Sequence, residues 1–179
     1  MTLKVLVIED DPDVRLGCEQ ALQLEGIPTH SAGSVEEARR FLCADYPGIV
    51  VSDIRLPRMD GLSFQRELTH DDPELPVVLI TGHGDISMAV KAMKDGAYDF
   101  IQKPFPPEQL VEVVKRALEK RRLLLEVREL RHRLEGRDQI EARLIGQSGG
   151  MMRVRELIAG LANSAADVLI QGETGTGKE

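Results

Sequence analysis

The chain has 179 residues, which suits one full domain with additional material or two small domains. Hydrophobic residues make up 42% of the chain and aromatic residues only 3%, so its core must consist mainly of aliphatic side chains. The net charge of −7 argues against nucleic-acid binding by this chain alone, because contacts to phosphate need clustered lysine and arginine.

The N-terminal sequence has one lysine followed by an apolar run that is too short for a signal peptide or a membrane span. The two cysteines, Cys18 and Cys43, lie in apolar-periodic stretches and form no CxxC or Cys/His cluster. We therefore expect buried free thiols in a reducing compartment, and a cytoplasmic protein that does not contact a membrane.

The first elements alternate between strand-like runs and helical spacing. Residues 5–8 are all apolar, and apolar residues at helical spacing follow over 14–24, where Gly26 stops the helix. A short strand is expected at 27–30. This order predicts a strand, a helix and a second strand.

The next helix has a recognisable start. Ser34 is expected to cap a helix over 35–42, with Glu37 three residues later as in a capping box. The apolar run at 49–51 predicts the third strand, and a helix over 62–68 is expected after the following turn.

The last strand and helix pairs follow the same rule. Residues 77–80 are a short apolar run, residues 98–101 are expected to form the last short strand, and Asp85 can cap a helix over 86–95 between them. Apolar strands that alternate with amphipathic helices are typical of a parallel sheet buried on both faces. The sequence therefore predicts a doubly wound α/β domain over about residues 1–105 plus one closing helix.

A long helical pattern begins at Pro107. Four leucine or valine residues in it are spaced by four, three and four positions, which resembles a short coiled-coil seam flanked by arginine and glutamate. These residues are Leu123, Val127, Leu130 and Leu134. We expect a linker helix over 107–140, losing its clear pattern at Gly136, that joins two copies of the chain. The alternative is a helix that lies on a neighbouring domain.

A second change in composition follows. Gly146, Gly149 and Gly150 predict a loop, a helix is expected over 154–161, and a strand is expected over 167–170. The chain then ends in Gly172-Glu173-Thr174-Gly175-Thr176-Gly177-Lys178-Glu179. This segment fits the phosphate-binding loop G-x-x-x-x-G-K-[ST] except at its last position. Gly172, Gly175, Gly177 and Lys178 are thus candidate nucleotide-binding residues.

Polar residues stand where four of the predicted strands end. Because ligands of parallel sheets collect at the carboxyl ends of the strands, these side chains should converge. Adjacent carboxylates repel one another unless a cation lies among them, and Mg²⁺ prefers oxygen ligands. The converging residues are Glu9, Asp10, Asp53, Thr81 and Lys103. Acids at strand ends also serve as helix caps, and Asp11 or Asp13 is readily explained in that way.

Four segments resemble the signature blocks of bacterial receiver domains of two-component response regulators. They are Val-Ile-Glu-Asp-Asp-Pro (7–12), Val-Ser-Asp-Ile-Arg-Leu-Pro-Arg-Met-Asp-Gly (51–61), Ile-Thr-Gly-His (80–83) and Lys-Pro-Phe (103–105). The resemblance implies a receiver over residues 1–120, with a five-stranded flavodoxin-like sheet of order 2-1-3-4-5. It also implies that Asp53 accepts a phosphoryl group from a sensor histidine kinase.

The same resemblance implies roles for the residues around Asp53. Asp10 would bind Mg²⁺ directly, Glu9 would act through water, and the backbone carbonyl of Arg55 would also contact the metal. Three further residues would respond to the phosphoryl group: Lys103 as its counter-charge, Thr81 as the switch hydroxyl and Phe100 as the switch aromatic. A cis peptide is expected at Lys103–Pro104.

The segment 143–179 resembles the start of the AAA+ domain of sigma-54-dependent activators, in which Glu occupies the position of Glu179. Within that group, Gly96-Ala-Tyr-Asp-Phe-Ile and the segment 81–90 resemble the C4-dicarboxylate transport regulators. The resemblance implies a homodimer built on the receiver and the linker helix. A full-length protein would use ATP, the sigma-54 RNA polymerase holoenzyme and enhancer DNA, whereas this chain is expected not to be an enzyme.

Two other functions were weighed against these residues. A metal-dependent phosphohydrolase could use Asp53 as its nucleophile, but Arg55 stands where the DxD motif of such enzymes has its second acid. A dinucleotide-binding protein would have a glycine-rich turn after its first strand, where this chain has acids.

Overall fold

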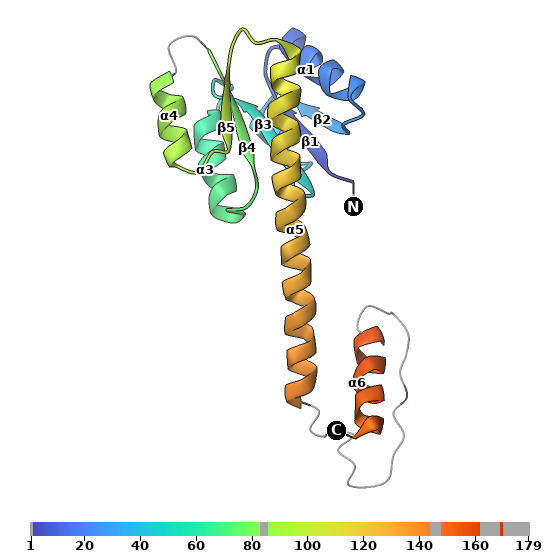
Figure 1. Ribbon diagram of the computed structural model, residues 1–179. Helices are drawn as coiled ribbons and strands as arrows, with labels where there is room; N and C mark the ends of the chain where they lie inside the picture. Colours follow the sequence, from blue (N-terminus) through green and yellow to red (C-terminus); the bar gives the residue numbers. More distant parts are fainter. Residues whose placement is uncertain (1, 83–85, 144–147, 162–168, 170–179) are drawn as a thin grey trace. The chain divides into compact units, whose positions relative to one another are not determined.

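The computed structural model describes residues 2–82, 86–143, 148–161 and 169. In these residues, five parallel strands form one sheet of order β2-β1-β3-β4-β5 (Figure 1). The strands are β1 (Lys4–Ile8), β2 (Thr29–Ala32), β3 (Gly48–Asp53), β4 (Val77–Thr81) and β5 (Asp99–Gln102). The helices are α1 (Pro12–Leu24), α2 (Val35–Ala38), α3 (Gly61–Asp71), α4 (Ile86–Lys94), α5 (Pro107–Arg143) and α6 (Gly149–Leu161). The predicted fold class and strand order are confirmed.

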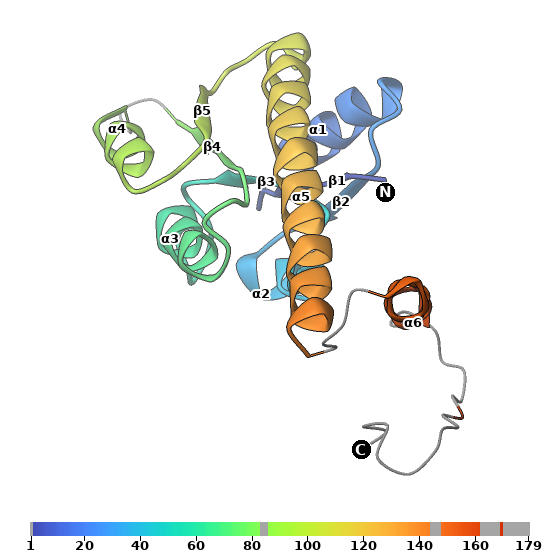
Figure 2. The same cartoon turned by 60° about the horizontal axis from the view of Figure 1, so that its bottom comes forward.

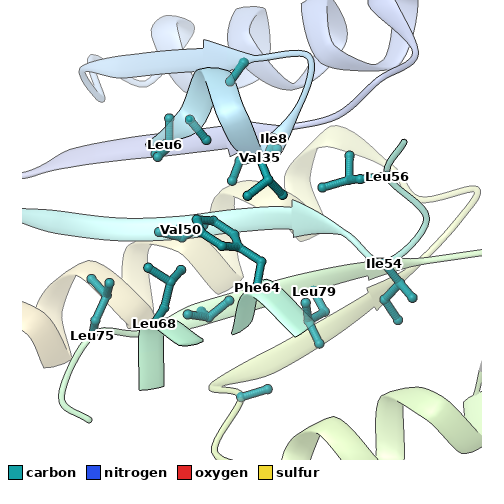
Figure 3. Close-up of a cluster of buried hydrophobic side chains, with 14 of the residues drawn as sticks. Leu6, Ile8, Val35, Val50, Ile54, Leu56, Phe64, Leu68, Leu75 and Leu79 are labelled. Atoms are coloured by element: carbon teal, nitrogen blue, oxygen red, sulfur yellow. The ribbon is translucent and has the colours of Figure 1, made fainter. Parts of the chain in front are cut away.

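Helices cover both faces of the sheet. Because successive side chains of each strand point to opposite faces, one strand can contribute to both cores. In β1, Leu6 and Ile8 join the core under α2, α3 and α4, whereas Val5 and Val7 join the core under α1 and α5. Figure 3 shows the first of these cores, with the ring of Phe64 from α3 at its centre, and Figure 2 shows α5 lying across the sheet. Both cores are almost entirely aliphatic, as the composition predicts.

Two helices that follow strands, α1 and α3, are capped by acids. The Asp11 carboxylate accepts hydrogen bonds from the backbone N–H groups of Asp13 and Val14, and Pro12 opens α1. The Asp60 carboxylate accepts the backbone N–H of Ser63 at 2.8 Å at the start of α3. Asp11 therefore has the capping role that was weighed for it.

Helix α2 is shorter than predicted. It ends at Ala38, and the next backbone N–H groups, those of Arg40 and Phe41, bond three residues back rather than four. Ser34 caps the helix as expected, but the Glu37 carboxylate takes the N–H of Gly33, at 2.8 Å, in place of that of Ser34.

Three further boundaries differ from the prediction. Strand β2 begins at Thr29, two residues late, because Pro28 has no N–H to donate to the ladder. Helix α5 begins at Pro107 as predicted but continues past Gly136 to Arg143. The loop predicted at Gly149 and Gly150 is wrong: they begin α6, where the Ser148 hydroxyl accepts the N–H of Met151.

The chain divides into two compact units, residues 1–127 with the sheet and residues 128–179. In the first unit, α5 packs Leu110, Val113, Val114 and Ala117 on the sheet. Beyond this contact three residues of the predicted seam are exposed, at 49% for Leu123, 44% for Val127 and 51% for Leu130, and the side chain of the fourth, Leu134, lies outside the described ones. No helix in the described ranges is both long and apolar enough to cross a membrane.

Candidate functional site

The carboxyl edge of the sheet brings together residues that are distant in sequence. Glu9 follows β1, Asp53 is the last residue of β3, Thr81 is the last residue of β4, and Lys103 follows β5. The ladder places Asp53 beside Ile80 and Thr81 beside Gln102, so the ends of these strands are adjacent. The predicted convergence of these side chains therefore exists for Glu9, Asp53 and Lys103, which are in direct contact.

Lys103 bridges two buried carboxylates. Its ammonium donates to Glu9 Oε2 at 2.7 Å and forms a second ion pair with Asp53. The Glu9 side chain is 1% exposed and that of Asp53 is 8% exposed, whereas a quarter of the Lys103 side chain is open to solvent. The Lys103 N–H donates to the Thr81 carbonyl at 2.7 Å, and the Lys103–Pro104 peptide is cis, as predicted.

The electrostatics of this cluster favour a cation. Burial raises the pKa of Glu9 to about 7, and the nearby charge of Asp53 adds to the rise while the Lys103 hydrogen bond opposes it. Burial alone would lower the pKa of Lys103, but its hydrogen bonds to Asp53 and Glu9 outweigh burial and raise it. One ammonium therefore only partly compensates two buried acids.

A third carboxylate opens the cluster to solvent. Oxygen atoms of Glu9, Asp10 and Asp53 all lie within 4.8 Å of one another, and Asp10 is exposed. A set of hard oxygen donors with one solvent-facing member fits Mg²⁺, which keeps several of its waters. The N–H of Arg55 donates to Asp53 Oδ1 at 2.9 Å, so the turn that contains the Arg55 carbonyl is tied to the same carboxylate.

The two predicted switch residues lie on neighbouring strands. Thr81 is buried, and its hydroxyl donates to the carbonyl of Gly82 at 3.1 Å. Phe100 is half-buried on β5, where it pairs with Leu79 and packs against the core under α3 and α4. No hydrogen bond described for these residues joins the Thr81 hydroxyl to Asp53.

Two residues of this edge escaped the sequence reasoning. Arg15 on α1 donates from Nη1 to the backbone carbonyl of Glu9 at 2.6 Å. Gly61 lies so close to β3 that a Cβ there would be 2.0 Å from the carbonyl oxygen of Asp53. The available signal for Arg15 was a basic side chain one turn into a helix that follows an acidic loop. The sequence indicated Gly61 only as the last residue of the receiver-like segment 51–61.

The candidate nucleotide-binding residues Gly172, Gly175, Gly177 and Lys178, the predicted cap Asp85 and most of the predicted strand 167–170 lie outside the described residues.

Comparison with known families agrees with this geometry. The family described as response regulator receiver domain matches residues 5–115, which is more than half of the chain. The chain belongs to the response regulator receiver family. The family described as sigma-54 interaction domain matches residues 144–179, so the receiver is followed by the start of a sigma-54 activation domain.

Several curated proteins are similar to nearly the whole chain. The C4-dicarboxylate transport transcriptional regulatory protein DctD of Pseudomonas aeruginosa is 51% identical over 98% of this chain, and that of Rhizobium meliloti is 50% identical over 98%. The chain spans 38% of the length of each of these two relatives. The receiver domain of NtrX from Brucella abortus is 42% identical, with a TM-score of 0.62, covering 65% of this chain and 98% of that domain. These matches do not support the phosphohydrolase alternative.

Proposed function

We propose that Asp53 accepts a phosphoryl group from a sensor histidine kinase, and that this reaction controls the assembly of a sigma-54-dependent transcriptional activator. The main support is the contact of Lys103 with both Asp53 and Glu9 at the carboxyl edge of the sheet. A carboxylate at the end of a central strand, paired with an ammonium and beside two more acids, is arranged for phosphoryl transfer.

The transfer follows from the positions of these groups. An Asp53 carboxylate oxygen attacks phosphorus, the P–N bond to the kinase histidine breaks, and its electron pair returns to the imidazole. Lys103, already paired with Asp53, remains as the counter-charge of the new phosphoryl oxygens. Glu9, Asp10, Asp53 and the Arg55 carbonyl would hold Mg²⁺, which when bound neutralises phosphoryl oxygens.

The response is carried by the next two strands. The Thr81 hydroxyl, bonded to Gly82 without phosphate, can turn to a phosphoryl oxygen. Phe100 then moves into the space that is vacated, which changes the surface of α4 and β5. We propose that this surface and the exposed leucine and valine residues of α5 form a homodimer.

The relatives suggest the wider context. In a longer protein, the domain that starts at residue 144 would use ATP and act on the sigma-54 RNA polymerase holoenzyme from enhancer DNA. We propose a cytoplasmic protein that regulates C4-dicarboxylate transport, on the similarity to the DctD proteins. The chain itself is proposed to be a phosphoacceptor and not an enzyme that turns over substrate.

Labelling with acetyl phosphate and Mg²⁺ tests the phosphoacceptor. Wild type is expected to take up one phosphoryl group, and Asp53→Asn none. Asp60→Asn is the matched control, since Asp60 is a nearby exposed acid and asparagine also caps a helix. Full labelling of Asp53→Asn would refute the proposal.

Sedimentation with and without beryllofluoride and Mg²⁺ tests the control of assembly. Wild type is expected to change its assembly state, and Val127→Glu to lose self-association. Leu16→Glu on α1 is the control, because Leu16 is as exposed as the seam, at 51%, but lies on another helix. An assembly state that beryllofluoride leaves unchanged in wild type would contradict the proposal.

A further inference from the structure

The acidic loop after β1 continues beyond the sheet ladder. The last paired residue of β1 is Ile8, which lies beside Ala32 and Ser52, and the N–H of Glu9 still donates to the Ala32 carbonyl at 3.1 Å. The carbonyls of Glu9 and Asp10 come after the paired part of the strand. Glu9 is buried, so its carbonyl is partly withdrawn from water and gains from a protein donor, whereas Asp10 is exposed.

The guanidinium of Arg15 supplies this donor. Its Nη1 donates to the Glu9 carbonyl at 2.6 Å and, over a longer 3.4 Å, to the Asp10 carbonyl. The two carbonyls belong to the two residues whose carboxylates face Asp53. Arg15 can reach back because side chains in the first turn of a helix point toward its N-terminus, and the Arg15 N–H is itself bonded to Asp11.

Gly33 makes room for the guanidinium. A Cβ at Gly33 would lie 3.3 Å from Arg15 Nη1 and 3.7 Å from the Glu37 carboxylate, which holds the Gly33 N–H. Arg15 therefore joins the end of β1, the first turn of α1 and the loop between β2 and α2. The first of these segments carries Glu9 and Asp10 of the acidic cluster.

We propose that Arg15 is a positioning residue of the phosphoacceptor site, which orients the peptides of Glu9 and Asp10 so that their carboxylates face a cation. This inference rests on the proposed function of Asp53. In this role Arg15 is not a metal ligand itself; it acts through the backbone of two residues that would hold the metal. Partners that orient ligands in this way typically change metal affinity by about 10- to 100-fold when they are removed.

A role of Arg15 as a positive charge and a role as a positioning residue predict opposite effects of Arg15→Gln on Mg²⁺ affinity. If Arg15 acted only as a nearby positive charge, its removal would tighten Mg²⁺ binding, because like charges repel. If Arg15 positions the loop, its removal weakens Mg²⁺ binding. The sign of the change therefore separates the two roles.

The test is the Mg²⁺ dissociation constant of the whole 179-residue chain, measured by calorimetry at constant ionic strength. Arg15→Gln is expected to weaken binding about tenfold. Arg15→Lys, which keeps one donor group, is expected to recover part of the loss. Arg66→Gln removes an arginine of the same charge from α3, where it is exposed, and is expected to bind Mg²⁺ like wild type.

Gly33→Ala provides an independent variant that retains the charge of Arg15. Its Cβ would crowd the guanidinium, so a smaller loss of Mg²⁺ affinity is expected, and this variant decides the question if Arg15→Gln fails to fold. Wild-type or tighter Mg²⁺ binding by folded Arg15→Gln would overturn the inference. A wild type that neither binds Mg²⁺ nor is labelled at Asp53 would refute the proposed function instead.

Discussion

Replacement of Arg121 by methionine is expected to lower the free energy of unfolding by about 3 kcal/mol. Arg121 is a fully buried arginine of α5. Its Nε and Nη2 donate to the Tyr46 carbonyl at 3.2 and 2.9 Å, and Nη2 also donates to Asp72 Oδ2 at 2.6 Å. One side chain therefore ties α5 to the start of β3 and to the end of α3.

The magnitude follows from these contacts. Removing one partner of a buried ion pair costs about 3–5 kcal/mol, because the other partner is left without its counter-charge. Two features place Arg121→Met at the low end. Asp72 is 16% exposed, so water can replace part of the lost bond. Arg121 Nη1 is buried without a hydrogen-bond partner among the described residues, so the wild type already bears a desolvation cost that methionine removes.

Urea unfolding followed by far-UV circular dichroism measures the effect, since the chain has no tryptophan. Arg116→Met is the matched control on the same helix: its side chain is 56% exposed and lies 3.3 Å from Asp99. We expect this change to cost less than about 1 kcal/mol. A double-mutant cycle with Asp72→Asn should show coupling for Arg121. If Arg121→Met lowers the free energy of unfolding no more than Arg116→Met does, the prediction is wrong.

Three further predictions concern single groups. Because the folded pKa of Glu9 is raised to about 7 from 4.5, its burial should cost nothing below pH 4.5 and about 3 kcal/mol above pH 7 without metal. In urea titrations, the free energy of unfolding of wild type should therefore fall relative to that of Glu9→Gln between pH 5 and 7.5. The same pH dependence in both proteins would contradict this. Cys18 is buried as expected, but the expectation is wrong for Cys43, which is exposed. Ellman's reagent should therefore modify Cys43 quickly but Cys18 only in urea, because burial raises the pKa of Cys18 to about 11; two fast thiols in the native protein would disprove it. Gly61→Ala should destabilise the fold by at least about 2 kcal/mol in the same urea assay, since its Cβ would lie 2.0 Å from a backbone carbonyl oxygen of β3. Gly17→Ala is the control and should not destabilise the fold in this way, because the space around Gly17 is open.

The sequence alone determined the sheet and the members of the acidic cluster. Apolar runs of three or four residues that alternate with amphipathic helices are typical of a parallel sheet covered by helices on both faces, and this pattern is local to each strand and helix. Glu9, Asp53 and Lys103 could be grouped without coordinates because each follows a recognisable strand, and the carboxyl ends of parallel strands share one edge.

Only the tertiary structure decided which groups complete these elements. Helix α2 ends early because the backbone N–H groups of Arg40 and Phe41 bond to carbonyls three residues back, and the spacing of the apolar residues does not indicate this change. Arg121 looks like any charged residue of a solvent-facing helix, yet its partner Tyr46 is 75 residues away in sequence. Arg15 likewise differs from its exposed neighbours only through the carbonyls that it reaches. Periodicity records which face of an element is buried, whereas the partner of a long polar side chain depends on where distant backbone segments come to lie.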